Sequence, residues 1–345
     1  VVDARAKQMK KEGHNVIGFG AGEPDFDTPL HIKSAAKAAI NQGFTKYTPV
    51  EGTLELRTAI SDYLKANVGL SYNEDQIIVS NGGKQCLYNA LFCIINPGDK
   101  VLIPSPYWVS YPEMVKLCGG IPVYVNTTEE TGFQLKADSI RPLIDEKTRV
   151  LIINSPSNPT GSVYSQEELQ EIAQLALENN ITIISDEIYE KLIYDGEKHV
   201  SIATLSEEIY QNTIVINGMS KAFSMTGWRI GYAAGPKNII KAMTSLQSHT
   251  TSNANSIAQR ASLEAFINPE RDKIIADMVD EFTRRKDYMV NTINSMNLLS
   301  CRKPKGAFYV MLNISETFGK NVDGKLVTDS TSFADLLLEK AKVAV

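Results

Sequence analysis

Residues that could carry covalent and acid–base chemistry follow several apolar, β-branched runs of the sequence. Each run is followed within a few residues by a polar side chain or a glycine turn of a kind that binds ligands. These features are Lys221, Asp186, Asn158 and the segment SNGGK at 80–84. Open α/β sheets bind their ligands at the carboxyl ends of the parallel strands, so we expect the four features to lie close together.

Each feature has an ordinary structural explanation when it is taken alone. A single lysine in a loop is usually just exposed, and an aspartate such as Asp186 usually caps the helix that follows its strand. The prolines around Asn158 make a rigid loop, and glycines such as those at 82–83 punctuate many strand-to-helix turns. Free N–H groups at the start of a helix can equally hold a phosphate. The features therefore become informative only in combination.

Their combination indicates pyridoxal 5′-phosphate (PLP). This cofactor needs an amine that bonds its aldehyde carbon, a carboxylate beside its pyridinium nitrogen, a phenol beside its ring oxygen and a cradle for its phosphate. Lys221, Asp186, Tyr189 and the turn at Gly83 supply these four parts at successive predicted strand ends. The sequence therefore predicts a PLP site at this edge of the sheet.

The chain also resembles the class I/II aminotransferases of PLP fold type I over essentially its whole length. The motifs that carry the resemblance are AGEPDF at 21–26, KYTP at 46–49, SNPTG at 157–161, SDEIY at 185–189, SK at 220–221 and GAFY at 306–309. The segments SNGGKQ at 80–85 and PSPYWVSYP at 104–112 look most like bacterial-type aspartate aminotransferases, some of which also act on prephenate. The resemblance implies transamination between an amino acid, L-aspartate above all, and a 2-oxo acid, with 2-oxoglutarate and also prephenate as acceptors.

The resemblance assigns roles around the cofactor ring. It implies that Lys221 bonds the cofactor covalently and then moves the proton between the substrate Cα and the cofactor carbon. Asp186 is expected to pair with the protonated pyridine nitrogen. Asn158 and Tyr189 are expected to hydrogen-bond the ring oxygen, and Trp108 to stack on the ring face.

The phosphate is expected to be held by backbone and side-chain groups together. The resemblance points to the backbone at Gly83 and Lys84, the hydroxyl of Ser220 and the guanidinium of Arg229, which suits bidentate contact with an anion. Tyr47 is expected to reach the phosphate of a neighbouring subunit. This contact implies a homodimer with shared active sites.

The substrate is expected to meet a second set of residues. The resemblance implies that Lys84 faces the distal carboxylate of a dicarboxylic substrate, although a lysine at a helix start is also simply solvated in many proteins. Gly22 would let the substrate carboxylate approach the backbone, and Trp108 and Asn158 complete the predicted substrate contacts. The resemblance places the arginine that binds the α-carboxylate in the last part of the small domain, so it is expected beyond Val345. The run 343–345 is itself typical of the start of a strand.

From residue 76 onward, apolar runs alternate with helical patterns, which predicts an α/β fold with a mainly parallel sheet flanked by helices. The predicted strands are 76–80, 101–103, 121–125, 150–154, 181–185 and 213–217, with a further strand at 307–312. Predicted helices include 84–95, 271–294 and 332–342, and Ser165 to Glu168 form a capping box. We divide the chain into an N-terminal segment 1–25, a large PLP-binding domain 26–270 and a smaller, incomplete α+β domain 271–345.

Composition argues against several other classes of protein. The net charge of −5 has no run of either sign, which disfavours nucleic acid as a partner. No apolar stretch approaches the roughly 20 residues that cross a bilayer. The four histidines show no metal-ligand spacing, so we expect no metal site. The four cysteines are scattered without a CxxC pair, which is typical of reduced thiols in a cytoplasmic protein, and whether a leader precedes Val1 stays open.

Two alternatives stay open at this point. A PLP-dependent lyase or decarboxylase on the same fold would carry the same cofactor residues, because the pocket selects which bond breaks. A ligand-sensing module without catalysis could also use this fold. Such modules usually adjoin a DNA-binding segment, and the sequence contains none.

Overall fold

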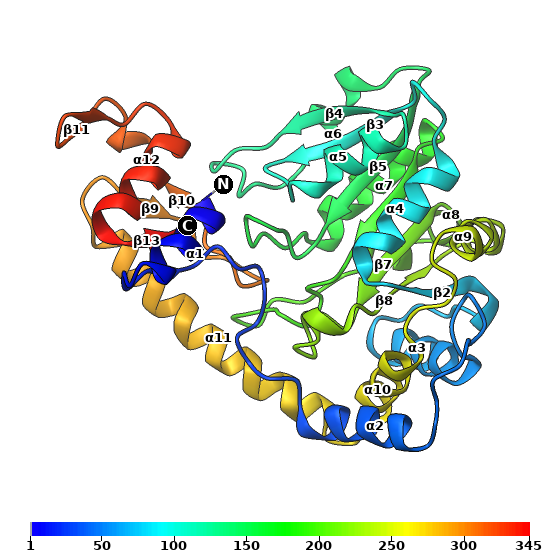
Figure 1. The fold of residues 1–345 in the computed structure, drawn as a ribbon. Helices are drawn as coiled ribbons and strands as arrows, with labels where there is room; N and C mark the ends of the chain where they lie inside the picture. The colour runs from blue at the N-terminus through cyan, green and yellow to red at the C-terminus, as the bar shows by residue number, and fades with distance from the viewer. Residues whose placement is uncertain (1) are drawn as a thin grey trace.

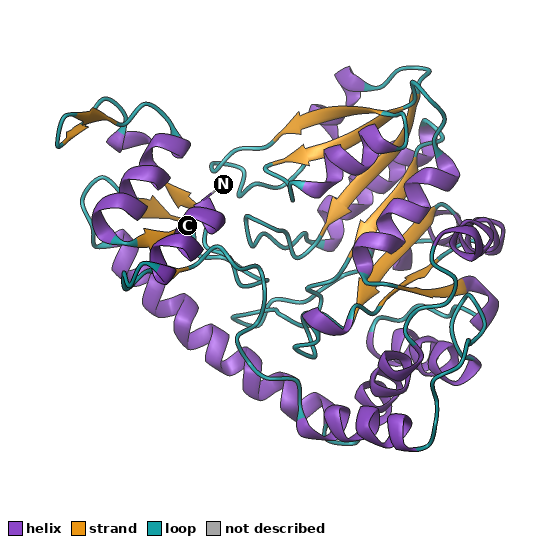
Figure 2. Ribbon diagram, in the orientation of Figure 1, coloured by secondary structure: helices purple, strands orange, loops and turns teal. Residues whose placement is uncertain are grey.

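The central element is a seven-stranded sheet with the strand order β2-β8-β7-β6-β5-β3-β4. This computed structural model describes residues 2–345. Figures 1 and 2 show the sheet as a twisted layer between helices. The strands are β2 (Ile77–Ser80), β3 (Lys100–Ser105), β4 (Ile121–Asn126), β5 (Thr148–Asn154), β6 (Thr182–Asp186), β7 (Thr213–Gly218) and β8 (Gly231–Ala234). The six strands predicted between residues 76 and 217 are confirmed, each to within a few residues.

Strand β8 was not predicted from the sequence. It runs antiparallel between β2 and β7, so it reverses the direction of one strand in an otherwise parallel sheet. Its four residues, Gly-Tyr-Ala-Ala, contain no β-branched side chain, yet all of them are buried. Its place in the sheet depends on pairing with both neighbours rather than on β propensity.

Helices cover both faces of the sheet. One face carries α4 (Gly83–Ile94), α5 (Ser110–Leu117) and α9 (Lys237–Thr250), and the other carries α3 (Leu54–Asn67), α7 (Gln166–Glu178) and α10 (Ser256–Ile267). In β7, Ile214 and Ile216 point to the first face and Val215 points to the second. This double coverage explains why the strands are apolar at almost every position.

The start of α7 has the capping residues that the sequence predicts, and a proline precedes α9. Ser165 accepts a hydrogen bond from the backbone of Glu168, whose carboxylate accepts one from the backbone of Ser165, so the predicted capping box is confirmed. Pro236 is the N-cap residue of α9, one position before the first helical residue.

The chain ends meet in the second part of the molecule. β1 (Ile17–Gly18) pairs in parallel with β13 (Val343–Ala344), and α1 (Val2–Lys11) lies beside them (Figure 1). The long helix α11 (Arg271–Asn294) has the bounds that the sequence predicts, and in Figure 1 it runs from α10 toward the C-terminal elements. The other elements of the chain are α2 (Leu30–Asn41), α6 (Ala137–Ile140), α8 (Glu207–Gln211), β9 (Ser300–Cys301), β10 (Leu312–Asn313), β11 (Asn321–Val322), β12 (Lys325–Leu326) and α12 (Ser330–Leu336). The division at residues 25 and 270 stays a prediction.

Two predicted elements near the C-terminus are wrong in detail. The segment 307–312 forms a strand only at its end, in β10, because Ala307 adopts a left-handed backbone (φ 57°) that interrupts an extended run. The helix expected at 332–342 ends as α12 at Leu336 and continues as one π-helical turn, Leu337–Ala341.

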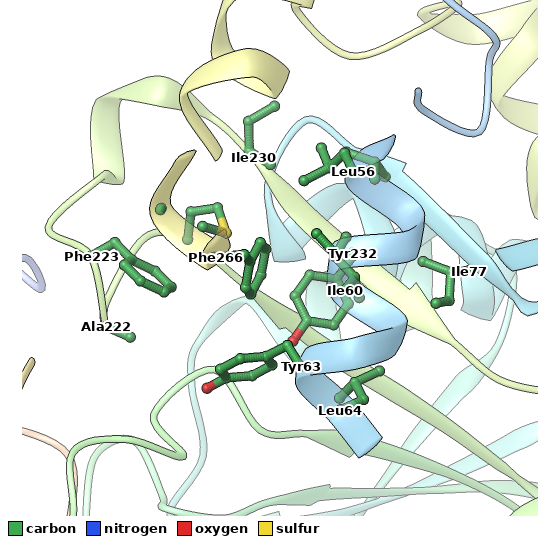
Figure 3. Close-up of a cluster of buried hydrophobic side chains, with 14 of the residues drawn as sticks. Leu56, Ile60, Tyr63, Leu64, Ile77, Ala222, Phe223, Ile230, Tyr232 and Phe266 are labelled. Atoms are coloured by element: carbon green, nitrogen blue, oxygen red, sulfur yellow. The ribbon is translucent and has the colours of Figure 1, made fainter. Parts of the chain in front are cut away.

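A buried aromatic cluster fixes the segment that follows β7. Figure 3 shows Ala222 and Phe223 packed with Tyr63, Tyr232 and Phe266. The rings of Phe223 and Phe266 meet edge to face with centroids 5.7 Å apart. Because Ala222 and Phe223 come directly after Lys221, this packing holds the backbone that carries the amine.

Two sequence expectations concern the whole chain. In the part of the chain that the structure describes, no helix is long and apolar enough to cross a membrane. All four cysteines are free thiols, and Cys86 and Cys301 are buried.

Candidate active site

The predicted residues converge on one edge of the sheet. β2, β3, β5, β6 and β7 all end at this edge, and the antiparallel β8 begins there. The segments at these ends carry Gly83, Trp108, Asn158, Asp186, Lys221 and Arg229. Topology therefore assembles residues that are up to 146 positions apart in the sequence between Gly83 and Arg229.

Lys221 is half-buried and is held from several sides. Its Nζ donates a hydrogen bond to the backbone carbonyl of Gly22. The same Nζ lies 5.5 Å from the ring centroid of Tyr189 and 5.4 Å from that of Phe308. Burial lowers the pKa of the Lys221 amine to about 8, and the negative charges of Glu23 and Asp186 oppose that shift only partly. A neutral, nucleophilic amine is therefore accessible near neutral pH.

Asp186 ends β6 as a buried carboxylate, with 4% of its surface exposed. Its Oδ2 accepts a hydrogen bond of 2.7 Å from the hydroxyl of Tyr111, and its Oδ1 accepts one of 3.3 Å from the backbone N–H of Ile188. Burial raises the pKa of this carboxyl to about 6, although both hydrogen bonds favour the ionised form. Among the described residues no cationic side chain forms an ion pair with it. A buried carboxylate of this kind suits a cationic ligand group.

Asn158 and Tyr189 meet through a third residue. The hydroxyl of Tyr309 lies 2.6 Å from that of Tyr189 and accepts a hydrogen bond of 3.2 Å from Nδ2 of Asn158. The backbone N–H of Asn158 donates to Oδ1 of Asn154, the last residue of β5, at 2.7 Å. The side-chain amide of Asn158 is thus held at a fixed position beside two phenols.

An anion-binding arrangement lies at the start of α4. Gly82 has φ 87°, and a Cβ there would stand 2.5 Å from a guanidinium nitrogen of Arg229, so the arginine packs directly against this backbone. The other guanidinium nitrogen of Arg229 donates to the carbonyl of Thr226 at 2.8 Å. The first N–H groups of α4, at Gly83 and Lys84, have no acceptor within the helix. Backbone N–H groups, the helix dipole and a guanidinium together fit a phosphate.

The comparisons with known proteins agree with this geometry. The family model described as "Aminotransferase class I and II" matches residues 14–345. This chain belongs to that family. The chain is therefore an aminotransferase, and the expected fold class is confirmed.

Three relatives illustrate the similarity. An aspartate aminotransferase of a Bacillus species is 49% identical over 344 residues, which are 100% of this chain and 86% of that protein. An aspartate/prephenate aminotransferase of Cereibacter sphaeroides is 47% identical over 346 residues, with coverages of 100% and 86%. The solved structure of an aspartate aminotransferase from Thermus thermophilus with maleate matches with a TM-score of 0.93 at 43% identity, and it covers 100% of this chain and 86% of that one. None of these three relatives is a lyase or a decarboxylase, so they do not support that alternative.

The predicted substrate residues of this aminotransferase lie in two groups, Lys84 with Trp108 and Gly22 beside Tyr309. Nζ of Lys84 lies 4.7 Å from the ring centroid of Trp108, which stands edge-on to Tyr111 at 5.4 Å. The exposed Lys84 is therefore directed over an aromatic ring of the site. Gly22 contacts the site through its carbonyl, and a Cβ at Gly22 would stand 3.0 Å from the hydroxyl of Tyr309.

Ser220 and Tyr47 lie in different surroundings. Ser220 is buried directly before Lys221. Tyr47 is 90% exposed.

A cavity of about 710 Å³ adjoins the site, and it is lined by residues 23–28, 224, 226–228, 255, 257 and 258. That cavity contains none of the predicted site residues.

Two residues of the aminotransferase site were missed by sequence reasoning. Tyr111 lies three positions after Trp108, a spacing that puts both side chains on one face of a helical turn, so this signal was available. Tyr309 belongs to a motif that was used only for the resemblance. Its contact with Tyr189 could not be anticipated, because the two residues are 120 positions apart.

Proposed function

We propose that this chain catalyses PLP-dependent transamination, with L-aspartate as the amino donor and 2-oxoglutarate as the principal acceptor. Prephenate is proposed as a further acceptor. The observation that carries the proposal is an amine with a pKa of about 8, at Lys221, beside a buried carboxylate that has no cationic partner among the described residues, at Asp186. Lys221 follows β7 by three residues, and Asp186 ends the neighbouring strand β6. The relatives from Bacillus and Cereibacter, an aspartate aminotransferase and an aspartate/prephenate aminotransferase, support aspartate and prephenate as substrates.

When bound, PLP supplies an electron sink that weakens the bonds to the substrate Cα. Asp186 would hold a proton at the pyridine nitrogen, because a buried carboxylate favours a cation beside it. The Tyr111 hydroxyl orients that carboxylate. Lys221 would bind the cofactor and, once free, take the proton from the substrate Cα at Nζ. A base with a pKa near the working pH is best suited to that transfer.

The phosphate would lie against the first turn of α4. The N–H groups of Gly83 and Lys84, the guanidinium of Arg229 and the hydroxyl of Ser220 would bind it. Anchoring the phosphate at one end and Asp186 at the other would fix the ring between them. Trp108 would cover one face of the ring and keep water away from it.

Selection of a dicarboxylic substrate would depend on Lys84. Its amine is directed over Trp108, so it would attract the distal carboxylate of aspartate or glutamate. The Thermus relative was solved with maleate, a dicarboxylate, which supports this choice of substrate. Gly22 and Asn158 would contact the α-carboxylate end.

We also propose a cytoplasmic homodimer with shared active sites. Tyr47 has no role within its own chain that explains a tyrosine with 90% exposure. It would complete the phosphate site of the partner subunit. The four free cysteines support a reducing compartment.

The test is a half-reaction with no second substrate. Aspartate alone should convert the bound PLP to its amine form, with one equivalent of the corresponding 2-oxo acid released per site. A lyase or decarboxylase would instead release ammonia or a carbon fragment and leave the aldehyde form of the cofactor. Repeating the experiment with glutamate, alanine and phenylalanine would rank the donors.

A further inference from the structure

The group that joins Asn158 to Tyr189 is a third side chain that has no assigned role. The hydroxyl of Tyr309 lies 2.6 Å from that of Tyr189, and it accepts from Asn158 at 3.2 Å. These three residues come from the loop after β5, the loop after β6 and the C-terminal part of the chain. Tyr309 is therefore the point at which the C-terminal part meets the two proposed ligands of the cofactor oxygen.

The backbone that carries Tyr309 is firmly mounted. The N–H groups of Lys305 and Gly306 both donate to the carbonyl of Gly161 at 2.9 Å, and that of Ala307 donates to the carbonyl of Leu192 at 2.9 Å. Gly161 lies just after Asn158, and Leu192 lies just after Tyr189. The segment 305–307 is thus hydrogen-bonded to the same two loops that present the cofactor ligands.

The neighbouring ring adds a second constraint. Phe308 stacks on Phe282 of α11 with ring centroids 5.4 Å apart, and it contacts Tyr309 at 4.8 Å. On the other side, a side chain at Gly22 would stand 3.0 Å from the Tyr309 hydroxyl. The hydroxyl therefore has little freedom to leave the position between Asn158 and Tyr189.

Either hydroxyl can donate in the Tyr189–Tyr309 hydrogen bond, and the two directions differ in which proton faces the site. Burial raises the pKa of both phenols, so each carries one proton. If Tyr189 donated to Tyr309, the proton of Tyr189 could not be donated to a ligand in the site. If Tyr309 donates to Tyr189, every donor is used: Asn158 to Tyr309, Tyr309 to Tyr189, and Tyr189 to a ligand in the site.

We propose that Tyr309 is a positioning residue of the cofactor site, whose hydroxyl donates to Tyr189 and so directs the Tyr189 proton to the ring oxygen of PLP. This inference rests on the proposed function. Tyr309 itself does not touch the reacting atoms. It acts by holding and polarising the phenol of Tyr189, as hydrogen bonds in a chain strengthen one another.

The consequence can be measured on the bound cofactor without turnover. A donor to the ring oxygen stabilises its negative charge most when the Lys221–cofactor linkage has lost its proton. Removing the donor chain should therefore raise the pKa of that linkage, which is seen as the pH midpoint of the visible absorbance. The expected rise in Tyr309→Phe is about 0.7 unit, the equivalent of one hydrogen bond between neutral groups.

The experiment titrates the absorbance of PLP-loaded wild-type protein and of Tyr309→Phe, Tyr189→Phe and the double variant. If Tyr309 acts through Tyr189, the double variant should titrate like Tyr189→Phe alone. Tyr210→Phe is the matched control, because it removes a hydroxyl that donates to the backbone carbonyl of Ser71 and lies in α8, before the amino end of β7 and so at the opposite edge of the sheet from the site. Its midpoint should equal that of the wild type.

The possible outcomes separate the inference from the proposed function. An unchanged midpoint in Tyr309→Phe, or additive shifts in the double variant, would overturn the role of Tyr309 while the proposed function stands. Wild-type protein that shows no visible band with PLP would overturn both. If Tyr309→Phe fails to fold, Gly22→Ala displaces the same hydroxyl by contact and should raise the midpoint, and an unchanged midpoint there would likewise overturn the inference.

Discussion

The hydroxyl of Tyr111 donates a 2.7 Å hydrogen bond to the carboxylate of Asp186, and both groups are almost completely buried. Tyr111 is carried by α5 on one face of the sheet, and Asp186 ends β6 within it. Because the backbone N–H of Ile188 donates to the other carboxylate oxygen, the two hydrogen bonds together fix the orientation of the carboxylate. Burial nevertheless raises the pKa of Asp186 to about 6, so in the cofactor-free protein its ionised form is destabilising.

Asp186→Asn should therefore separate stability from activity. The folded-state pKa of Asp186 lies about two units above the ordinary value, so ionising it costs the cofactor-free protein about 3 kcal/mol at pH 8. This cost appears as pH rises from about 4 to 6 and is absent below pH 4. Cofactor-free Asp186→Asn should then melt a few degrees above the wild type at pH 8 and equally with it at pH 4.

The same variant should lose at least about 10²- to 10³-fold in turnover with PLP, because the charge beside the ring nitrogen is gone. Calorimetry measures the melting temperature of the cofactor-free variant, and a coupled assay measures the turnover of the PLP-loaded variant. Asp138→Asn, at an exposed position, is the control for both. Full turnover in Asp186→Asn would contradict the role of the carboxylate.

The pH dependence of cofactor attachment should follow Lys221. Its pKa of about 8 means that the neutral amine is fully present above that pH and falls about tenfold per unit below it. The rate of covalent PLP incorporation, measured by trapping with borohydride over time, should rise up to about pH 8 and then level off. A rate that kept rising to pH 10 would indicate an ordinary exposed lysine.

Gly82→Ala should weaken cofactor binding through Arg229. The new Cβ would stand 2.5 Å from the guanidinium and would displace it from the start of α4. Loss of one charge-assisted hydrogen bond should raise the dissociation constant of PLP about ten- to hundredfold. Gly43→Ala is a matched control, because Gly43 has φ 74° with nothing within 4 Å of its Cβ position, so it adds backbone strain alone. Equal losses in both variants would assign the effect to strain.

Lys84→Met should change donor selectivity rather than chemistry. The KM for aspartate should rise about ten- to hundredfold, while kcat/KM for alanine should change by less than about threefold. Lys241→Met, at an exposed position of α9, should leave both unchanged. A parallel loss with alanine would show that Lys84 has a role other than binding the distal carboxylate.

The accuracy of the sequence predictions follows from how local each signal is. Strands such as β5 and β7 are β-branched and apolar because both sheet faces are covered, so their positions follow from sequence alone. Strand β8 has only glycine, tyrosine and alanine, and its pairing with β2 and β7 decides its structure. The left-handed backbone at Ala307 likewise depends on tertiary contacts, which is why a continuous strand at 307–312 was wrongly predicted.

The site shows the same distinction. Lys221, Asp186 and Asn158 stand directly after predictable strands, so topology alone brings them together. The spacing from Trp108 could have placed the ring of Tyr111 in the site. No local pattern marks its hydrogen bond to Asp186, 75 positions away, or that of Tyr309 to Tyr189, 120 positions away. The residues that hold the ligands of the cofactor in place are therefore harder to predict than the ligands themselves.

The most direct test of the account is to reduce the PLP-loaded protein with borohydride, digest it and map the modified lysine by mass spectrometry. The account predicts one modified position, Lys221, and no modification in Lys221→Ala, which should also lose its visible absorbance and its turnover. A cofactor fixed to another lysine such as Lys84, or turnover that survives in Lys221→Ala, would contradict it.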